Sequence, residues 1–329
     1  MTEQELRRER IRRRRERERA RKRRRLLLIP FVLIILLLLS TLVRLLIPRH
    51  TAFAGGEALS WYIHHRDGDL IETPLSMAGY EAMSNLLVEI EPGKNHNKKA
   101  SAYAYDTAYV RSVIRGEEEY NGKKIAFLTF DDGPNHKISP KVLDVLKEKK
   151  VPATFFVVGR NLTDKYKDVL FREMREGHAI AMHSMTHDYS KLYPGRVGST
   201  NRIGYEAQET QKILQEYFGP DFKSTVWRYP GGHLSWKGLT DGPDQAVRDA
   251  GAEWIDWNCL IGDAEPKRVR PTTTAGMVEY LDKSLKANRH QNMAVVLMHD
   301  AENKSLTLEA LPDVIDYFQE EGYTFGILN

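Results

Sequence analysis

The stretch IAFLTFDDGP, residues 125–134, joins an apolar run to two adjacent carboxylates and a Gly-Pro turn. Successive side chains of a strand point to opposite faces, so Asp131 and Asp132 diverge where the run ends. Asp-Gly-Pro is also ordinary turn chemistry. A functional role for the pair therefore requires further polar groups at the same end of the same sheet.

The pattern around this stretch repeats from Gly122 onward, where short apolar runs rich in Ile, Val and Phe alternate with amphipathic segments. The runs predict strands at 125–130, 153–159, 178–183, 226–230, 253–258, 294–299 and 324–328. The amphipathic segments predict helices that include 139–150, 169–177, 204–219, 274–289 and 311–322. Strands that alternate with helices predict an α/β fold with a parallel sheet and outer helices, most simply a barrel.

The polar candidates follow the predicted strands. In such barrels the working residues gather at the carboxyl ends of the strands. The residues that stand there are Asp131, Asp132, His183, His187, Arg228, Asp263 and His299. Chance placement would scatter such residues over both ends of the strands and over the helices, so this ordering favours one active-site rim.

His183 and His187 are four residues apart, so in a helical turn they would share a face and bind one metal ion. Alone, such a pair is more often solvated surface. Asp132 on the same rim adds a third ligand and leaves a coordination position open for water. This is the arrangement of a catalytic zinc site.

The remaining candidates fit the hydrolysis of an acyl bond. Asp131 fits a general base that takes a proton from the attacking water, and Arg228 would hold a nearby carboxylate charged and in place. If the bond is an amide, the leaving amine needs a proton, and His299 is a candidate acid. Backbone N–H groups of the turn at 230–232 could stabilise an oxyanion.

These motifs, in this order, resemble those of polysaccharide deacetylases with a NodB homology domain (carbohydrate esterase family 4), over residues 121–329. TFDDGP matches the first motif, in which the first Asp is the base and the second a metal ligand. HSMTH matches the second motif, whose histidines complete the metal site. The resemblance thus implies that Asp131 is the base and that Asp132, His183 and His187 are the ligands.

The later motifs supply the other implied roles. RYPGG matches the third motif: the resemblance implies that Arg228 orients the catalytic Asp and that the Gly231 N–H faces the oxyanion. Leu297-Met298-His299 matches the fifth, where Leu297 would line the pocket for the acetyl methyl group and His299 would be the acid. Asp263 would tune His299.

Two departures from the family pattern affect the substrate groove. The family usually has Trp after the Asp of the fourth motif, whereas Ala264 follows Asp263 here. One wall of the groove is therefore absent or supplied by another residue, with Trp257 as a candidate. The third motif often has an aromatic residue where Gly231 stands, which would leave the pocket more open.

The resemblance implies a distorted (β/α)7 TIM-like barrel and a divalent metal, zinc foremost, with cobalt or manganese as alternatives. The expected reaction removes N-acetyl groups from a cell-wall or surface polysaccharide, with peptidoglycan N-acetylglucosamine as the leading substrate. One alternative is an O-acetyl esterase on a polysaccharide such as xylan. Another is a glycan-binding barrel without catalysis, in which a lost base or ligand would be expected, but none is lost here.

The N-terminal part predicts a membrane anchor. Residues 1–25 carry fourteen Lys and Arg against five Glu, and residues 26–43 contain no charge. An apolar run of this length spans a bilayer, and the basic excess before it places the N-terminus in the cytoplasm. We therefore expect a single-pass protein of the cell membrane whose catalytic domain is extracellular. The competing reading is a signal peptide cleaved after Ala54.

The sequence thus divides into a basic cytoplasmic tail (1–25), a transmembrane signal anchor (26–48), an extracytoplasmic stalk or small annex (49–120) and the catalytic domain (121–329). Residues 50–329 hold 33 Lys and Arg against 40 Asp and Glu, so the globular part is acidic. The basic tail is then a topology signal, and no nucleic-acid partner is expected. The single Cys259 cannot form an internal disulfide.

Overall fold

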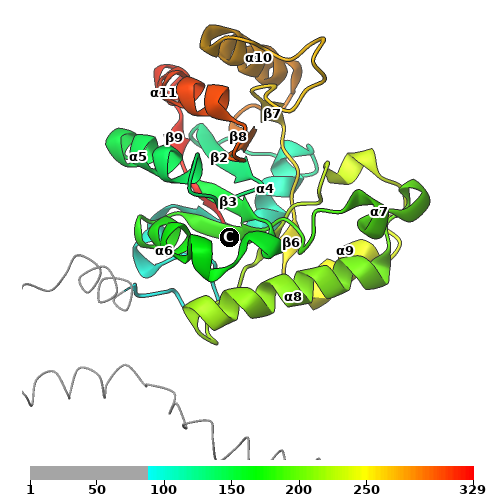
Figure 1. Cartoon of the computed structure of the whole chain (residues 1–329). Coiled ribbons are helices and arrows are strands. Elements are labelled where there is room, and N and C mark those ends of the chain that lie inside the picture. The colour runs from blue at the N-terminus through cyan, green and yellow to red at the C-terminus, as the bar shows by residue number, and fades with distance from the viewer. Residues whose placement is uncertain (1–87) are drawn as a thin grey trace, which may run out of the picture. The chain divides into compact units, whose positions relative to one another are not determined.

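A curled parallel sheet organises the part of the chain that the structure, a computed structural model, describes: residues 88–329 (Figure 1). Its strand order is β6 (Glu253–Trp254), β5 (Val226–Trp227), β4 (Ala179–Met182), β3 (Thr154–Val157), β2 (Ile125–Asp131), β8 (Met293–His299) and β7 (Cys259–Leu260). A further strand, β9 (Thr324–Phe325), pairs with the start of β2, and each of these pairings is parallel. The α/β fold with a curled parallel sheet is therefore confirmed. Within residues 88–329 the end strands β6 and β7 do not pair with each other, so the sheet is a half-barrel and not the closed barrel that seven units suggested.

Helices cover the outer face of this sheet. They are α5 (Ser139–Lys149), α6 (Lys167–Arg175), α8 (Thr200–Phe218), α9 (Pro243–Asp249), α10 (Thr274–Ala287) and α11 (Ser305–Glu320), with a short α7 (Tyr189–Leu192) after β4. Helices α10 and α11 lie side by side at one end of the molecule and α8 and α9 at the other (Figure 1). Short 3-10 helices occupy Lys98–Tyr103, Gly159–Asn161, Asp164–Tyr166, Pro194–Arg196 and His233–Ser235.

The predicted elements are present with shorter or shifted bounds. The runs at 226–230 and 253–258 form strands of only two residues each, because the chain leaves the sheet there and turns into loops. The run at 324–328 divides at Gly326 into β9 and β10 (Ile327–Leu328). Helix α9 and strands β1 (Ala104–Tyr105) and β7 were not predicted.

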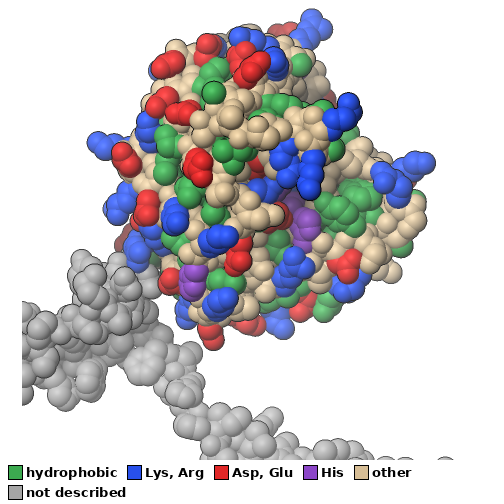
Figure 2. Space-filling model, turned by 45° about the horizontal axis from the view of Figure 1, so that its top comes forward, with side chains coloured by type: hydrophobic (Ala, Val, Ile, Leu, Met, Phe, Trp, Pro, Cys, Tyr) green, Lys and Arg blue, Asp and Glu red, His purple; other side chains and the backbone are tan. Residues whose placement is uncertain are grey.

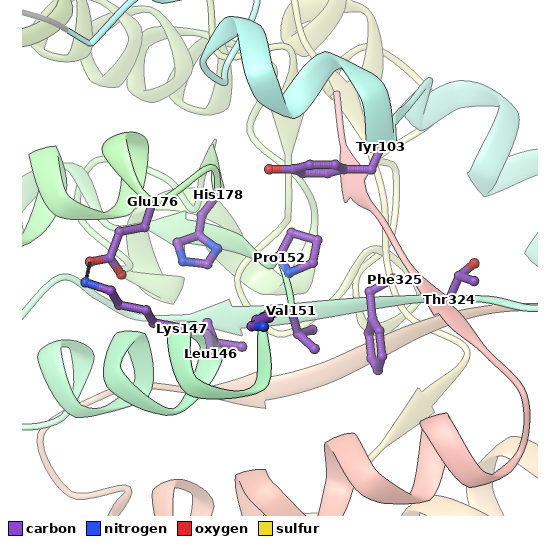
Figure 3. Close-up of a pocket in the computed structure, with 10 residues that line it drawn as sticks. Tyr103, Leu146, Lys147, Val151, Pro152, Glu176, His178, Thr324 and Phe325 are labelled. Atoms are coloured by element: carbon purple, nitrogen blue, oxygen red, sulfur yellow. Dashed lines mark ion pairs between the residues drawn. The ribbon is translucent and has the colours of Figure 1, made fainter.

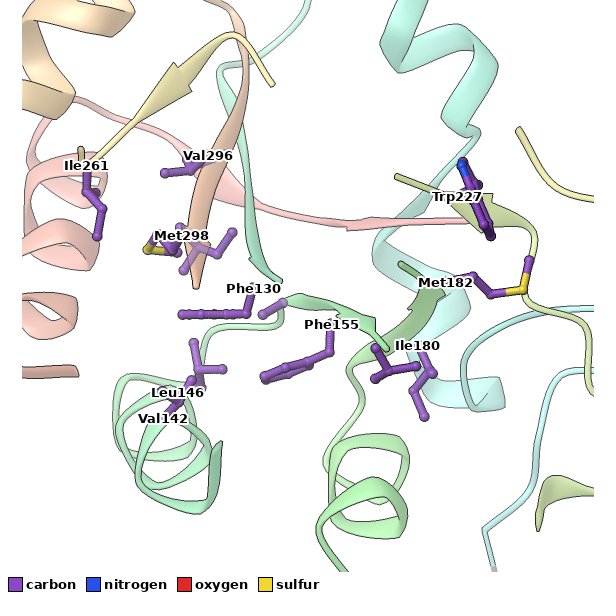
Figure 4. Close-up of a cluster of buried hydrophobic side chains, with 14 of the residues drawn as sticks. Phe130, Val142, Leu146, Phe155, Ile180, Met182, Trp227, Ile261, Val296 and Met298 are labelled. Atoms are coloured by element: carbon purple, nitrogen blue, oxygen red, sulfur yellow. The ribbon is translucent and has the colours of Figure 1, made fainter. Parts of the chain in front are cut away.

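Alternation along β2 decides which side chains reach the inside of the sheet. Ala126, Leu128 and Phe130 belong to the large apolar cluster under the outer helices. Figure 4 shows Phe130 in this cluster, near Val142 and Leu146 of α5. Ile125 and Phe127 belong to a second cluster inside the curl. Because the period of a strand is two, Thr129 and Asp131 continue the inner row. A buried strand thereby presents polar groups to the interior only at its carboxyl end.

The same alternation orients two other strands. Along β8, Val295 lies in the inner cluster and Val296 in the outer one, so His299 falls on the inner side. After β5, inward Val226 and outward Trp227 are followed by Arg228, which points inward and is fully buried. Three strands therefore direct a carboxylate, an imidazole and a guanidinium to one place.

The segment that precedes β2 packs into the inside of the sheet. Helix α4 (Thr107–Ile114) buries Val110, Val113 and Ile114 in the inner cluster and contacts both β6 and β8. Arg111 donates hydrogen bonds to the Glu253 carboxylate and to the Trp254 carbonyl, at 2.8 and 2.7 Å. Residues 88–120 thus belong to the same compact unit as the sheet, and this unit extends to the N-terminal side of Asn121.

The predicted tail at 1–25, the predicted anchor at 26–48 and residues 49–87 of the predicted stalk lie outside the described residues. Among residues 88–329, no helix is long and apolar enough to cross a membrane.

Candidate active site and metal centre

The three predicted metal ligands meet at the carboxyl ends of β2 and β4. Asp132 follows β2 with a positive φ of 83°, which turns its side chain back over the sheet edge. The segment from His183 to His187 is a loop and not the helical turn that the four-residue spacing suggested. Ser184 and His187 in this loop have φ values of 65° and 52°. This left-handed backbone, not a helix face, makes the two rings converge.

The ligand atoms are close enough to share one cation. His187 Nε2 lies 3.4 Å from Asp132 Oδ1, and His183 Nε2 lies 3.9 Å from the same oxygen. All three ligand atoms lie within 4.8 Å of one another. A tetrahedral ion with bonds of about 2.1 Å separates its ligands by about 3.4 Å, so the site fits a metal after small adjustments.

Hydrogen bonding fixes the orientation of the His183 ring. Its Nδ1 lies 2.9 Å from the Arg228 carbonyl oxygen, so Nδ1–H donates there and Nε2 keeps a free lone pair toward Asp132. Burial, and then the neighbouring His187, lower the pKa of His183 to about 3. The ring is therefore neutral at ordinary pH, as a metal ligand must be.

Asp131 lies beside this centre and is held by Arg228. Arg228 Nη1 donates to Asp131 Oδ1 at 2.9 Å and to Thr129 Oγ1 at 2.7 Å. The other oxygen of Asp131, Oδ2, lies 3.7 Å from His183 Nε2. One carboxylate oxygen is thus fixed by the guanidinium, while the other faces the space next to the metal ligands.

His299 and Asp263 form a second pair across the pocket. His299 Nδ1 donates to Asp263 Oδ1 at 2.9 Å, and the His299 backbone N–H donates to Oδ2 at 2.9 Å. Burial lowers the pKa of His299, but the charge and hydrogen bond of Asp263 outweigh it, so the pKa lies above its ordinary value. Burial raises the pKa of Asp263, but the neighbouring His299 and Lys304 lower it by more. The pKa therefore lies below its ordinary value, and Asp263 stays ionised.

These groups line a pocket of about 350 Å³. Its other walls are Tyr189, Gly231, Trp257, Leu260, Ala264, Glu265, Leu297 and Lys304. Figure 2 shows histidine and acidic side chains in a hollow of the surface, with basic side chains on one rim and hydrophobic ones on another. Trp257 and the short Ala264 thus both line this pocket.

The turn after β5 brings its backbone close to the pocket. Gly231 and Gly232 have φ values of 80° and 85°, and a Cβ at Gly232 would lie only 2.8 Å from the Trp257 ring. The carboxylate of Asp256 accepts the N–H of His233 at 2.8 Å and that of Leu234 at 3.3 Å. The turn is therefore fixed with the Gly231 backbone on the pocket wall.

Sequence reasoning missed the groups that hold these loops. Glu206 of α8 is buried and accepts the N–H of Met185 at 3.0 Å, the N–H of Thr186 at 2.9 Å and the Thr186 hydroxyl at 2.7 Å. One signal existed: Glu206 falls on the helix face occupied by Ile203, Ala207 and Thr210, where a charge needs partners. Asp256 and Thr129 carried no comparable signal.

A larger cavity of about 640 Å³ lies at the other end of the strands, before β3 and β4 (Figure 3). Its walls include Tyr103, Val151, Pro152 and Phe325. The one carboxylate among the ten lining residues, Glu176, pairs with Lys147 and Arg172. The candidate chemistry therefore belongs to the smaller pocket.

Comparison with known proteins agrees with this geometry. Residues 118–253 match the family model described as polysaccharide deacetylase. A peptidoglycan-N-acetylglucosamine deacetylase of Bacillus cereus is 33% identical over 208 residues, which cover 63% of this chain and 70% of that protein.

Solved structures are also similar. A CE4 esterase of Streptococcus mutans has 48% sequence identity and a TM-score of 0.69, and the match covers 73% of this chain and 98% of that one. The catalytic domain of a peptidoglycan N-acetylglucosamine deacetylase from Eubacterium rectale has 31% identity and a TM-score of 0.53 over 64% of this chain and 91% of that one. The resemblance drawn from the motifs is confirmed: the chain belongs to the polysaccharide deacetylase family and is a hydrolase of N-acetyl amide bonds.

Proposed function

We propose that this protein is a metal-dependent peptidoglycan N-acetylglucosamine deacetylase. The observation that carries the proposal is one pocket lined by the Asp132, His183 and His187 ligand set, by Asp131, which the buried Arg228 holds, and by the His299–Asp263 pair. Amide hydrolysis needs a group that activates water, a base and an acid for the leaving amine. The pocket supplies residues for all three.

The ligand set supports a divalent ion. Two neutral imidazoles and one carboxylate suit zinc, and cobalt or manganese accept the same donors. When bound, such an ion would polarise the acyl oxygen and make a water molecule more acidic. The buried His183, oriented by the Arg228 carbonyl, has the second-sphere support that metal-ligating histidines usually have.

The protein side chains divide the proton transfers between them. Asp131, with one oxygen held by Arg228, accepts the proton of the attacking water. The N–H of Gly231 donates to the oxygen of the attacked carbonyl, and Leu297 lines the space for the acetyl methyl group. His299, held protonated by Asp263, gives its proton to the departing sugar amine. These roles are supported by the position of Asp131, Gly231, Asp263, Leu297 and His299, which all line the pocket.

The choice of peptidoglycan rests on the relatives and on the expected topology. The relatives from Bacillus cereus and Eubacterium rectale are named for peptidoglycan N-acetylglucosamine. A single-pass anchor at residues 26–48, with the N-terminus in the cytoplasm, would hold the catalytic domain outside the membrane, next to that polymer. Acetylated xylan is the competing substrate, since another relative is named a bifunctional xylanase/deacetylase.

The test is acetate release by the 329-residue chain, purified in detergent, from peptidoglycan, from N-acetylglucosamine oligomers and from acetylated xylan. Asp131→Asn and chelator-treated protein are the controls. Release from peptidoglycan that needs both Asp131 and metal supports the proposal. Release from xylan alone would replace it with the esterase function. Binding of oligomers without release from any substrate would favour a glycan-binding barrel.

A further inference from the structure

The turn after β5 carries no side chain where it meets the catalytic pocket, because positions 231 and 232 are both glycine. A Cβ at Gly231 would lie 3.2 Å from the Tyr189 hydroxyl oxygen and 3.4 Å from the Trp236 ring. The space beside Gly231 is therefore occupied by aromatic side chains from other segments of the chain.

Tyr189 stands where it can meet a substrate. It is the first residue of α7, and its ring lies 5.4 Å from that of His187 and 5.2 Å from that of Trp236. The side chain remains 44% exposed. It lines both the catalytic pocket and an adjoining depression of about 580 Å³ that includes Arg160 and Lys191. The ring thus forms part of the edge that the two hollows share.

The hydroxyl of Tyr189 is a free donor within the described residues. It makes no hydrogen bond to any side chain or backbone group of residues 88–329, whereas the neighbouring Trp236 Nε1 donates to the Pro230 carbonyl at 2.9 Å. A phenol keeps one donor and one acceptor. A half-exposed donor at the edge of a pocket, with its ring held by two neighbours, is arranged for a ligand.

We propose that Tyr189 contacts the glycan, its hydroxyl donating a hydrogen bond to the sugar ring whose acetyl group is removed. It thereby supplies the wall that the side chain of a larger residue at Gly231 would otherwise form. This inference rests on the proposed deacetylase function. A sugar offers hydroxyl and ring oxygens as acceptors around its acetamido group, while a simple acetyl ester offers none of them.

The test compares Tyr189→Phe with Tyr193→Phe. Tyr193 belongs to the same aromatic group, because its ring stacks on Trp236 at 4.1 Å, but its buried hydroxyl does not line the pocket. Both changes remove one oxygen and keep the ring. Three experiments are made: calorimetry gives the Kd for an N-acetylglucosamine oligomer, acetate release from it gives kcat and KM, and hydrolysis of 4-nitrophenyl acetate gives kcat/KM.

Loss of one neutral hydrogen bond weakens binding by about threefold to tenfold. We expect Tyr189→Phe to raise the Kd and KM for the oligomer by about that factor and to leave kcat/KM for 4-nitrophenyl acetate unchanged. Tyr193→Phe should leave all of these constants unchanged. Unchanged oligomer constants in Tyr189→Phe would overturn the inference. A parallel loss on 4-nitrophenyl acetate would overturn it too, since the hydroxyl would then serve the acyl group. If the original chain released no acetate and Tyr189→Phe still weakened binding of the oligomer, the deacetylase proposal would be refuted. The contact between Tyr189 and the glycan would then stand.

Discussion

Arg228 and Asp131 form an ion pair with 2.9 Å between Nη1 and Oδ1, and their side chains are 0% and 3% exposed. The guanidinium also donates to Thr129 Oγ1 and to the carbonyls of Ile255 and Asp256. Its carbon lies 3.9 Å from the centre of the Phe156 ring. These contacts hold the arginine in place, and the arginine in turn holds the carboxylate of Asp131, the proposed base.

Replacing Arg228 with Met should impair both stability and activity. The change leaves Asp131 as a buried charge without its partner, which typically costs about 3–5 kcal/mol of unfolding free energy. Displacement of the base should lower kcat/KM by about a hundredfold. Urea denaturation and acetate release measure the two effects. Adding Asp131→Asn to Arg228→Met should recover part of the stability but none of the activity. Equal stability of the single and the double variant would contradict the ion pair.

The pH profile of kcat should show the His299–Asp263 pair. As an acid, His299 must be protonated, so activity falls as the pH rises through its pKa, which lies above the ordinary 6.5. Removing the charge of Asp263 with Asp263→Asn should shift this alkaline limb to lower pH. Lys304 lowers the pKa of His299, so Lys304→Met should shift the limb to higher pH. Shifts in the same direction would refute this assignment.

Glu206 should control metal affinity without touching the metal. Glu206→Gln weakens the acceptor that holds Met185 and Thr186 between the two histidine ligands. Loss of such support typically lowers metal affinity by about tenfold to a hundredfold. Competition with a chromogenic chelator measures it. Glu216→Gln, an exposed position on the same helix, is the control and should bind metal as the original chain does.

Asp300 should make stability depend on pH in a defined window. Burial raises its pKa to about 7 despite its hydrogen bond with Ser139, whereas the ordinary value is 3.8. Between these values the folded chain keeps a proton that the unfolded chain has released. The unfolding free energy therefore falls as pH rises through the window, by about 1.4 kcal/mol per unit, and levels off above it.

Asp300→Asn should remove this contribution, because the amide does not titrate. Urea unfolding of both proteins from pH 4 to pH 8 gives the comparison. The difference in unfolding free energy between them should change through the window and become constant above about pH 7. A constant difference throughout would mean that Asp300 is ionised when folded.

The sequence was most informative where strands end. The carboxyl-end rule predicts that Asp131, Arg228 and His299 share one rim, and the structure brings them together: Asp131 and His299 line one pocket, and Arg228 pairs with Asp131. Short strands such as β6 and β7 carry too few residues to show a period, so the open edge of the half-barrel could not be foreseen.

The convergence of His183 and His187 was predicted from the wrong local structure. A spacing of four fits a helix face, yet left-handed residues at Ser184 and His187 produce the convergence. Such φ values in residues other than glycine depend on tertiary contacts, here those of Glu206, more than twenty residues of sequence away from Ser184. A local sequence pattern gives no information about contacts between residues that far apart in the sequence.

The pairing of β1 with β10 makes the folding of the domain depend on the synthesis of its residues 327 and 328. Ala104 and Tyr105 lie beside Ile327 and Leu328, and Thr107 donates to the carbonyl of Asn329. The inner helix α4 can therefore be locked in place only after Asn329 has left the ribosome. Until then the apolar inside of the sheet lacks this contact, so we expect the domain to complete its folding only after β10 has been synthesised.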